Sequence, residues 1–215
     1  HRRGYRDAVG PAPINEVLAA GLIRLSGWAG HQALYDPMCG SGTLLTEAAI
    51  YADNIPANIY RKDFSFMYWK DYDADLHATI EESALNKAKP SSVKILGSDE
   101  DMSMLTKAQI NIEKALFQDR IEIWQENFIG SKKPVDTGLI IFNPPYDQKL
   151  ASDNDRLYKE IGDTLKQGYS GWKAWFITSD LEALKHLGLR TKSKIKMYNG
   201  KLECRFVGLD LYDGK

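Results

Sequence analysis

Short apolar strands alternate with amphipathic helices along this sequence, and the alternation ends in two consecutive strands. The first strands are expected at residues 33–37, 93–99, 121–125, 138–143 and 172–179, with helices at 43–52, 102–117 and 153–167. Strand–helix–strand units join parallel neighbours through right-handed crossovers. The pattern therefore predicts a doubly wound, three-layer α/β sheet.

The tail of the chain departs from this alternation. Residues 194–212, KIKMYNGKLECRFVGLDLY, form two alternating runs joined by Asn199-Gly200, a pair typical of two-residue hairpin turns. The sheet is therefore expected to have seven strands, mostly parallel, and to end in an antiparallel hairpin. Ahead of the first strand, apolar residues recur at helical spacing over 14–25, after Pro13 at a position that suits a helix start.

One globular domain is expected over residues 31–215, preceded by an N-terminal segment and amphipathic helix over 1–30 and interrupted by an insertion over about 52–92. The insertion contains FSFMYWKDYDAD, whose aromatic side chains interleave with charges. Such aromatics either stack on nucleic-acid bases or belong to a lid packed onto the body. The chain opens with HRRGYR and no Met, so we expect it to be a piece of a longer protein.

Composition narrows the choice of partner and compartment. The chain has 28 Lys and Arg against 29 Asp and Glu, so no global positive field would hold a nucleic acid. Two cysteines, no signal peptide and no apolar run of transmembrane length favour the cytoplasm. Cys39 fits a small buried filler better than a reactive thiol. The histidines show no metal-ligand spacing, and no metal is expected.

A glycine loop, DPMCGSGT, lies at residues 36–43 between the first strand and its helix. Gly40 and Gly42 allow a tight turn and a close approach of a ligand to the backbone, and the helix start offers free N–H groups. A carboxylate or phosphate would suit this place. The loop lacks the Gly-Lys-Ser/Thr of a Walker loop and the full dinucleotide fingerprint, and a purely structural turn is the alternative.

The next two strand ends add polar groups. Asp99 ends the second strand, where a carboxylate can accept both hydroxyls of a ribose; a helix cap is the alternative. After the third strand, Asn127 or Glu126 could receive an adenine amine, or both could be solvated. A glycine loop beside a ribose acid favours a nucleoside whose other end carries a carboxylate, as S-adenosylmethionine does.

The fourth strand runs into Asn-Pro-Pro-Tyr, residues 143–146. A planar amine conjugated to a ring is a poor nucleophile until its N–H bonds are held and its lone pair is aimed. The side-chain oxygen of Asn143 and the carbonyl of Pro144 can accept those bonds, Pro145 stiffens the backbone, and Tyr146 can stack on the ring. Methyl transfer then needs in-line positioning and no strong base. A turn that merely ends a strand is the alternative.

These motifs together resemble a known family. They are similar to motifs of the RNA methylase family, whose members join a THUMP RNA-binding domain to a Rossmann-like class I methyltransferase domain. The similar stretches are DPMCGSGTLLTEAA, GSDED and NPPY, with HRRGYR, APINEVLAAGLI, LYKEIGDTLK, GWKAWFITS and YNGKLEC. The resemblance covers nearly the whole chain. It is strongest to the catalytic domain of bacterial 23S rRNA guanine-N2-methyltransferases, and we expect the THUMP domain to be absent before HRRGYR.

The resemblance implies a role for each motif residue. The methionine end of S-adenosylmethionine would be lined by Asp36, Pro37, Cys39, Gly40, Ser41 and Gly42. Asp99 would bind the ribose and Asn127 would lie beside adenine. Asn143, Pro144, Pro145 and Tyr146 would hold the target guanine, and Pro13 with Ile14 would cover the cofactor. Four residues depart from the family pattern: Glu100 replaces an apolar residue, Asn127 an acid, and Asp147 and Gln148 a Gly-Glu pair.

The resemblance thus implies methylation of the N2 amine of a guanine in 23S rRNA. Asn-Pro-Pro-Tyr also suits an adenine-N6 DNA methyltransferase or a protein-glutamine methyltransferase, and a non-catalytic, cofactor-binding RNA scaffold is a further alternative. For the RNA partner, the dense basic groups are Arg2, Arg3, Arg6, Arg190, Lys192, Lys194 and Lys196. They are expected either to contact phosphates around a flipped-out nucleotide or to form a solvated face.

Overall fold

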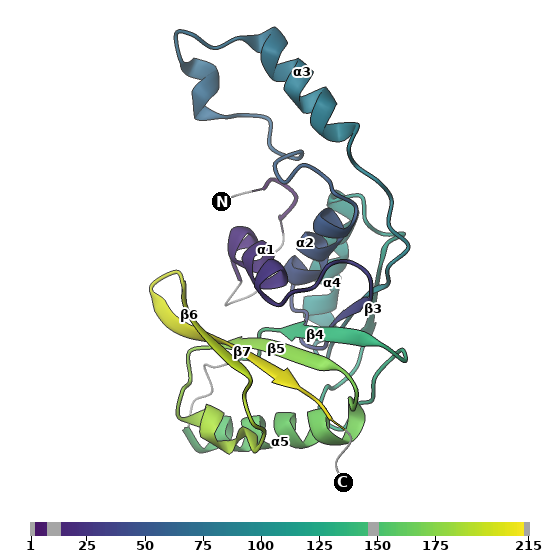
Figure 1. Cartoon of the computed structure of the whole chain (residues 1–215), viewed down its shortest axis with the longest axis vertical. Coiled ribbons are helices and arrows are strands. Elements are labelled where there is room, and N and C mark those ends of the chain that lie inside the picture. Colours follow the sequence, from purple (N-terminus) through teal and green to yellow (C-terminus); the bar gives the residue numbers. More distant parts are fainter. Residues whose placement is uncertain (1–2, 8–13, 146–150, 213–215) are drawn as a thin grey trace.

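A computed structural model describes residues 3–7, 14–145 and 151–212 of the chain, coloured along the sequence in Figure 1. The strands are β1 (Ala33–Asp36), β2 (Ile95–Asp99), β3 (Ile121–Gln125), β4 (Gly138–Phe142), β5 (Lys173–Thr178), β6 (Ser193–Asn199) and β7 (Leu202–Asp210). The helices are α1 (Glu16–Leu25), α2 (Thr43–Ala52), α3 (Ala74–Leu85), α4 (Met102–Lys114) and α5 (Ala151–Gly168), with short 3-10 turns η1 (Ser65–Tyr68) and η2 (Ala183–Leu187).

The seven strands form one sheet in the order β3-β2-β1-β4-β5-β7-β6. The strands β3, β2, β1, β4 and β5 are parallel, and each pairs with the next in this order. β7 is antiparallel to both of its neighbours, β5 and β6. The predicted mixed sheet with a terminal hairpin is confirmed. The order reverses between β1 and β4, and ligands of doubly wound sheets bind outside the carboxyl ends of strands at such a point.

Two hydrophobic clusters cover the two faces of the sheet, because successive strand residues point to opposite sides. Leu34, Leu139 and Ile141 belong to the cluster that includes α1, α2 and α4. Tyr35 and Ile140 belong to the cluster beneath α5 and η2. Figure 1 shows α5 and η2 along the lower face, with α1, α2 and α4 above. The described helices include none long and apolar enough to cross a membrane.

Gly97 in β2 illustrates how closely the upper layer approaches the sheet. A Cβ built on Gly97 would lie 2.4 Å from Cδ1 of Leu45 in α2 and 3.3 Å from Cβ of Cys39. A larger residue here would push α2 and the loop before it away from the strand ends. The missing side chain of Gly97 therefore helps to fix the height of the glycine loop.

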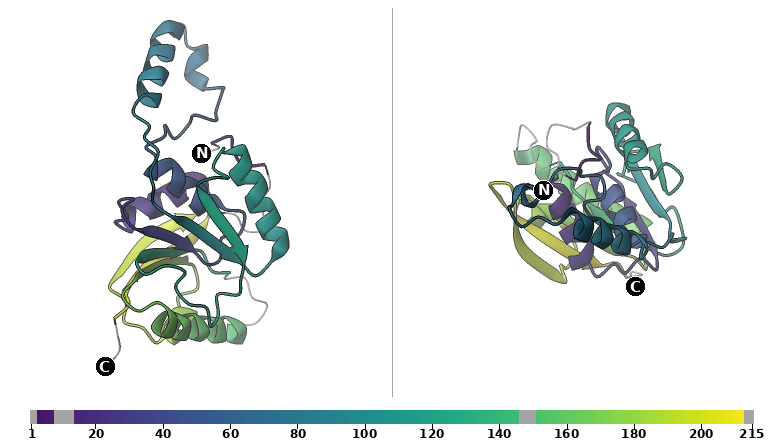
Figure 2. Two further views of the ribbon diagram at one scale, coloured as in Figure 1. Left: turned by 90° about the vertical axis from the view of Figure 1, so that its right-hand side faces the viewer. Right: turned by 90° about the horizontal axis from the view of Figure 1, so that it is seen from above.

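The segment between α2 and β2 protrudes from the body. We call residues 56–90 the arm; it contains η1 and α3 and extends beyond the helical layer on the side away from α5 (Figures 1 and 2). None of the residues of α3 is buried. The expectation that the aromatic residues of 64–75 belong to a lid or insertion packed onto the body is wrong in its packing, because Phe64, Phe66 and Tyr72 pack on one another and on His77. The contact of the arm with the body lies at its base, at Tyr60.

Candidate functional site

Three of the motifs meet at one edge of the sheet. β1 lies between β2 and β4, with Leu34 paired to both Ile95 and Leu139 along parallel ladders. The carboxyl ends of these strands are therefore neighbours. Asp36 ends β1, Asp99 ends β2 and Asn143 follows β4. The topology brings together the glycine loop, the expected ribose acid and the Asn-Pro-Pro corner.

The glycine loop turns through two left-handed backbone positions. Gly40 has φ 54° and Gly42 has φ 78°, which side chains rarely adopt. The Gly42 N–H donates to the Cys39 carbonyl at 2.8 Å, and Gly42 is the N-cap of α2. No side chain of the described residues caps α2, so the first N–H groups of the helix are left for a ligand.

Asp99 joins the second strand to this loop. Its Oδ2 accepts the Gly40 N–H at 2.8 Å and its Oδ1 accepts the Asp101 N–H at 3.0 Å. The N-cap of α4 is Asp101, whose side chain accepts from Ser103 N. The helix-cap alternative for Asp99 is therefore wrong. In the part of the chain that the structure describes, each carboxylate oxygen of Asp99 accepts one hydrogen bond and keeps a lone pair, enough to accept the two hydroxyls of a ribose.

Asp36 is a buried carboxylate at the foot of the loop. Only 1% of it is exposed, and its Oδ1 accepts the Met38 N–H at 3.1 Å. Burial, opposed by that hydrogen bond and reinforced by the nearby Asp99, raises the pKa of Asp36 well above its usual range. Buried charge is costly unless it is paired. A cationic ligand group, such as the ammonium of a methionine moiety, would lower that cost.

The remaining loop residues form the walls. Pro37, Cys39 and Ser41 are buried. Burial, with Asp36 and Asp99 close by, raises the pKa of Cys39, as expected of a filler and not of a reactive thiol. The Ser41 carbonyl accepts from Nδ2 of Asn111 at 2.9 Å.

Asn111 was missed by sequence reasoning. It is fully buried in α4, and its Oδ1 also accepts the Asp7 N–H at 3.1 Å. Asn111 thus ties the glycine loop to the N-terminal segment. The sequence does contain a sign of this role, because Asn111 lies three residues after Ala108 on the otherwise apolar face of an amphipathic helix.

After β3 the two candidates for an adenine contact separate. Oε2 of Glu126 accepts from the Tyr35 hydroxyl at 3.2 Å and from the Trp124 indole at 3.0 Å, which occupies it within the body. Asn127 is exposed and donates from Nδ2 to Oε2 of Glu100 at 2.9 Å. Glu100 and Asn127, which both depart from the family pattern, are therefore partners of each other.

Asn143 presents an unpaired acceptor. Its Oδ1 is buried and, in the part of the chain that the structure describes, has no hydrogen-bond partner. Pro144 behind it is buried and Pro145 is exposed. A buried carbonyl oxygen without a donor is costly, and a ligand N–H would satisfy it. Tyr146, Asp147 and Gln148, like Pro13 and Arg2, lie outside the described residues.

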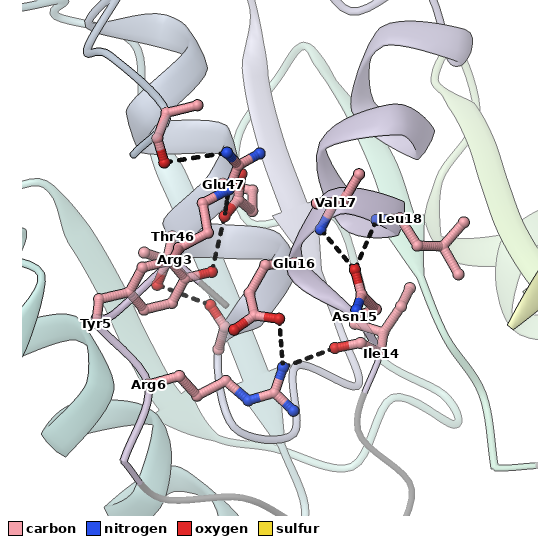
Figure 3. Close-up of polar contacts among 12 residues, drawn as sticks. Arg3, Tyr5, Arg6, Ile14, Asn15, Glu16, Val17, Leu18, Thr46 and Glu47 are labelled. Atoms are coloured by element: carbon pink, nitrogen blue, oxygen red, sulfur yellow. Dashed lines mark hydrogen bonds and ion pairs between the residues drawn. The ribbon is translucent and has the colours of Figure 1, made fainter. Parts of the chain in front are cut away.

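Arg3 and Arg6 of the N-terminal segment form ion pairs within the protein. Nε of Arg3 lies 2.9 Å from Oε1 of Glu47, which also accepts from the Tyr5 hydroxyl at 2.9 Å. Nη1 of Arg6 donates to the Ile14 carbonyl at 2.8 Å and lies 3.5 Å from Oε2 of Glu16. Figure 3 shows Arg3 and Tyr5 converging on Glu47, and Arg6 between Ile14 and Glu16.

These contacts correct the expectation that Arg3 and Arg6 contact RNA phosphates or form a solvated face. Arg3 is only 8% exposed, and both guanidinium groups face carboxylates within the protein. They hold the N-terminal segment against α2 and α1. Ile14, expected to cover the cofactor, is buried and its carbonyl is fixed by Arg6.

The C-terminal basic residues differ among themselves. Lys192 pairs with Asp210 at 2.5 Å and Lys196 with Glu203 at 2.7 Å. Arg190 and Lys194 are exposed, and neither has a carboxylate partner among the described residues. Among the described basic residues that were expected to contact RNA phosphates, only Arg190 and Lys194 are therefore free to face an anion.

Comparison with known proteins agrees with this geometry. Residues 3–207 match a family model described as RMKL-like, methyltransferase domain. The chain is 36% identical over 216 residues to slr0064 of Synechocystis, provisionally named an RNA methyltransferase, covering 99% of the chain and 56% of that protein. It is 38% identical over 213 residues to the ribosomal RNA large subunit methyltransferase K/L of Shewanella oneidensis, covering 96% of the chain and 30% of that protein.

A solved structure is also similar along the entire chain. The crystal structure of SMU.472 in complex with SAH has a TM-score of 0.88 and 31% sequence identity, covering 100% of this chain and 56% of that one. The chain thus spans between about a third and a little over half of the proteins it matches.

Proposed function

Because this chain belongs to the RMKL-like methyltransferase family, we propose that it methylates the exocyclic N2 amine of a guanine in 23S rRNA. S-adenosylmethionine is its cofactor; when bound, it supplies a methyl group on a positively charged sulfur. The chain covers 30% of the K/L relative from Shewanella, so the RNA substrate and the position of the base belong to this proposal.

The residues at the strand ends suit this cofactor. Gly40 and Gly42 make the left-handed turn that leads into α2, whose N-terminus no described side chain caps and where a carboxylate is favourable. Asp36 provides a buried negative charge for an ammonium group, and Asp99 provides acceptors for ribose hydroxyls. The same chemistry would be poorly matched to a polyphosphate, which two neighbouring carboxylates repel.

The observation that carries the catalytic role is the buried Oδ1 of Asn143, which has no hydrogen-bond partner among residues 3–7, 14–145 and 151–212. This oxygen and the Pro144 carbonyl would accept the two N–H bonds of the target amine. The amine lone pair would then be free of ring conjugation and directed at the methyl carbon, and the proton would leave after attack. No residue has to act as a strong base.

The test separates binding from chemistry. Asn143→Ala is expected to bind S-adenosylmethionine with unchanged affinity by calorimetry and to lose methyl transfer to 23S rRNA, followed by mass spectrometry of the nucleosides. Asn86→Ala, an exposed amide after α3, is the matched control and should retain both. Normal transfer by Asn143→Ala would contradict the amine-aiming role.

The identity of the product distinguishes the alternatives. N2-methylguanosine supports the proposal, whereas methylated adenine in DNA or a methylated protein glutamine would support one of the other amine acceptors of the Asn-Pro-Pro-Tyr motif. Binding of S-adenosylmethionine without any methylated product would fit the non-catalytic, cofactor-binding RNA scaffold.

A further inference from the structure

The arm contains a hollow that the proposed reaction does not use. It has a volume of about 580 Å³ and lies between η1 and α3, with Phe64, Phe66, Trp69, Tyr72, Leu76 and Ile80 among its lining residues. This volume falls within the range of about 300 to 1,000 Å³ that is usual for ligand sites. The arm, which contains all the residues that line the hollow, extends from the body on the side away from α5 (Figure 1).

The floor of the hollow is built by aromatic contacts. The rings of Phe64 and Phe66 stack with centroids 5.2 Å apart, and His77 meets Phe66 edge-on at 5.1 Å. The Tyr72 hydroxyl lies 2.9 Å from Nδ1 of His77. These contacts hold η1 against α3 and give the hollow a defined shape in the free protein.

The apolar rim is uncovered. Trp69 is 66% exposed, Leu76 56% and Ile80 57%, and the last two are four residues apart on one face of α3. An isolated helix of 12 residues is marginally stable in water, and most helical stability comes from packing of the apolar face. A contiguous apolar surface of this kind usually marks an interaction site.

The charges around the hollow restrict its partner. Its lining includes Asp71, Asp73 and Glu81 but no Lys or Arg, and residues 71–85 carry five carboxylates and no Lys or Arg. Arg61, whose guanidinium lies 4.8 Å from the centre of the Phe64 ring, adds one positive charge beside the hollow, but the three lining carboxylates outnumber it. RNA phosphates are therefore disfavoured here, which argues against the base-stacking alternative. A second copy of the chain docked face to face would bring the same carboxylates together.

We propose that the arm binds a segment of another protein in which apolar side chains alternate with Lys and Arg. The apolar side chains would enter the hollow between Trp69 and Ile80, and the cations would face the carboxylates of α3. Recognition of an amphipathic segment by an apolar groove with an oppositely charged rim is a common binding mode.

The base of the arm would hold such a partner in a fixed place. Nη1 of Arg3 donates to the Ala57 carbonyl at 3.0 Å, and the Tyr60 hydroxyl donates to the Ala115 carbonyl at 2.8 Å. The Tyr5 and Tyr60 rings meet edge-on with centroids 5.8 Å apart. The arm is thus tied to the N-terminal segment and to the end of α4, and this interaction does not depend on methyl transfer.

The experiment uses the whole chain and a synthetic 14-residue amphipathic peptide of Leu and Lys, labelled for fluorescence anisotropy. Trp69→Ala and Ile80→Ser are each expected to weaken peptide binding at least tenfold. Leu25→Ser, at a residue on α1 that is 50% exposed, should leave it unchanged. A peptide with Glu in place of Lys should bind at least tenfold more weakly. Circular dichroism verifies the fold of each variant.

Three results would overturn the proposal. The first is peptide binding that is absent, or equally strong in Trp69→Ala and in the wild type. The second is binding of a 12-nucleotide oligouridylate that both arm variants weaken, which would make the arm an RNA surface. The third is a dimer, detected by light scattering, that Trp69→Ala dissociates, which would make a second copy the occupant.

Discussion

The buried carboxylate of Glu47 should make the stability of the protein depend on pH. Burial raises the pKa of Glu47 to about 7, against the lowering effects of Arg3 and of the Tyr5 hydrogen bond. In the unfolded chain the group returns to its ordinary pKa of 4.5. Between these two values the folded chain holds a proton that the unfolded chain has released.

The sign follows from linkage. A group that binds more protons in the folded state loses its stabilising contribution as pH rises, here from about 4.5 through about 7. The contribution is fully present below the unfolded value and is lost above the folded one. Each pH unit over which only the folded chain holds the proton lowers the free energy of unfolding by about 1.4 kcal/mol. Between pH 5 and pH 8 the contribution of Glu47 to the free energy of unfolding therefore falls by about 2 to 3 kcal/mol.

Glu47→Gln removes this titration while keeping an acceptor oxygen for Tyr5. Urea unfolding of both proteins at pH 5, 6, 7 and 8 should show the free energy of unfolding of the wild type, relative to the variant, falling by about 2 to 3 kcal/mol across the series. Glu113→Gln, at an exposed glutamate of α4, is the matched control and should follow the wild type. Parallel curves for the wild type and Glu47→Gln would refute the reasoning.

Two predictions concern the strand ends. Asp99→Ala should weaken S-adenosylmethionine binding by about 1 to 3 kcal/mol, because it removes a charged acceptor and releases the Gly40 N–H; an unchanged dissociation constant in calorimetry would exclude Asp99 from the site. Gly42→Ala should lower the free energy of unfolding by about 1 to 3 kcal/mol, since Gly42 has φ 78° and a new Cβ would lie 3.3 Å from Cβ of Ala108. Gly171→Ala, at φ 82° in open space, is its control, and equal losses would show that packing against Ala108 contributes nothing.

The centre of the fold was predictable because β1 and β4 are short, apolar and fully buried. An apolar run such as 138–143 in an α/β chain is expected to form a buried strand. The Asn199-Gly200 pair predicts the hairpin turn from local sequence alone. The ends of helices were harder to predict from the sequence. The apolar pattern continues to Phe117, but α4 ends at Lys114 and Leu116 has a φ of 60°. The arm was not predictable, because an aromatic and charged sequence does not reveal whether its rings pack on the body or on each other.

The placement of charges required the tertiary structure. A cluster of arginines looks the same in sequence whether it faces solvent or a buried acid 44 residues away, as Arg3 does with Glu47. The one hint is Glu47 itself, the only charged residue of TLLTEAAIYA, because a carboxylate on a buried helix requires a partner. The meeting of the strand-end motifs was easier to predict, since the order of strands in a doubly wound sheet brings their carboxyl ends together whatever the surrounding side chains are.

The pair Glu100 and Asn127 shows how two departures from a family pattern can depend on each other. The resemblance implies that Asn127 lies beside adenine, but its Nδ2 donates to Glu100 and its Oδ1 accepts the Ile129 N–H at 2.8 Å. One lone pair on Oδ1 and the second carboxylate oxygen of Glu100 are then the acceptors left at this corner. An exocyclic amine donates two hydrogens, so it matches the pair better than the amide alone. We therefore expect that the negative charge that an acid at position 127 would supply is provided here by Glu100, and that changing either residue alone disturbs both contacts.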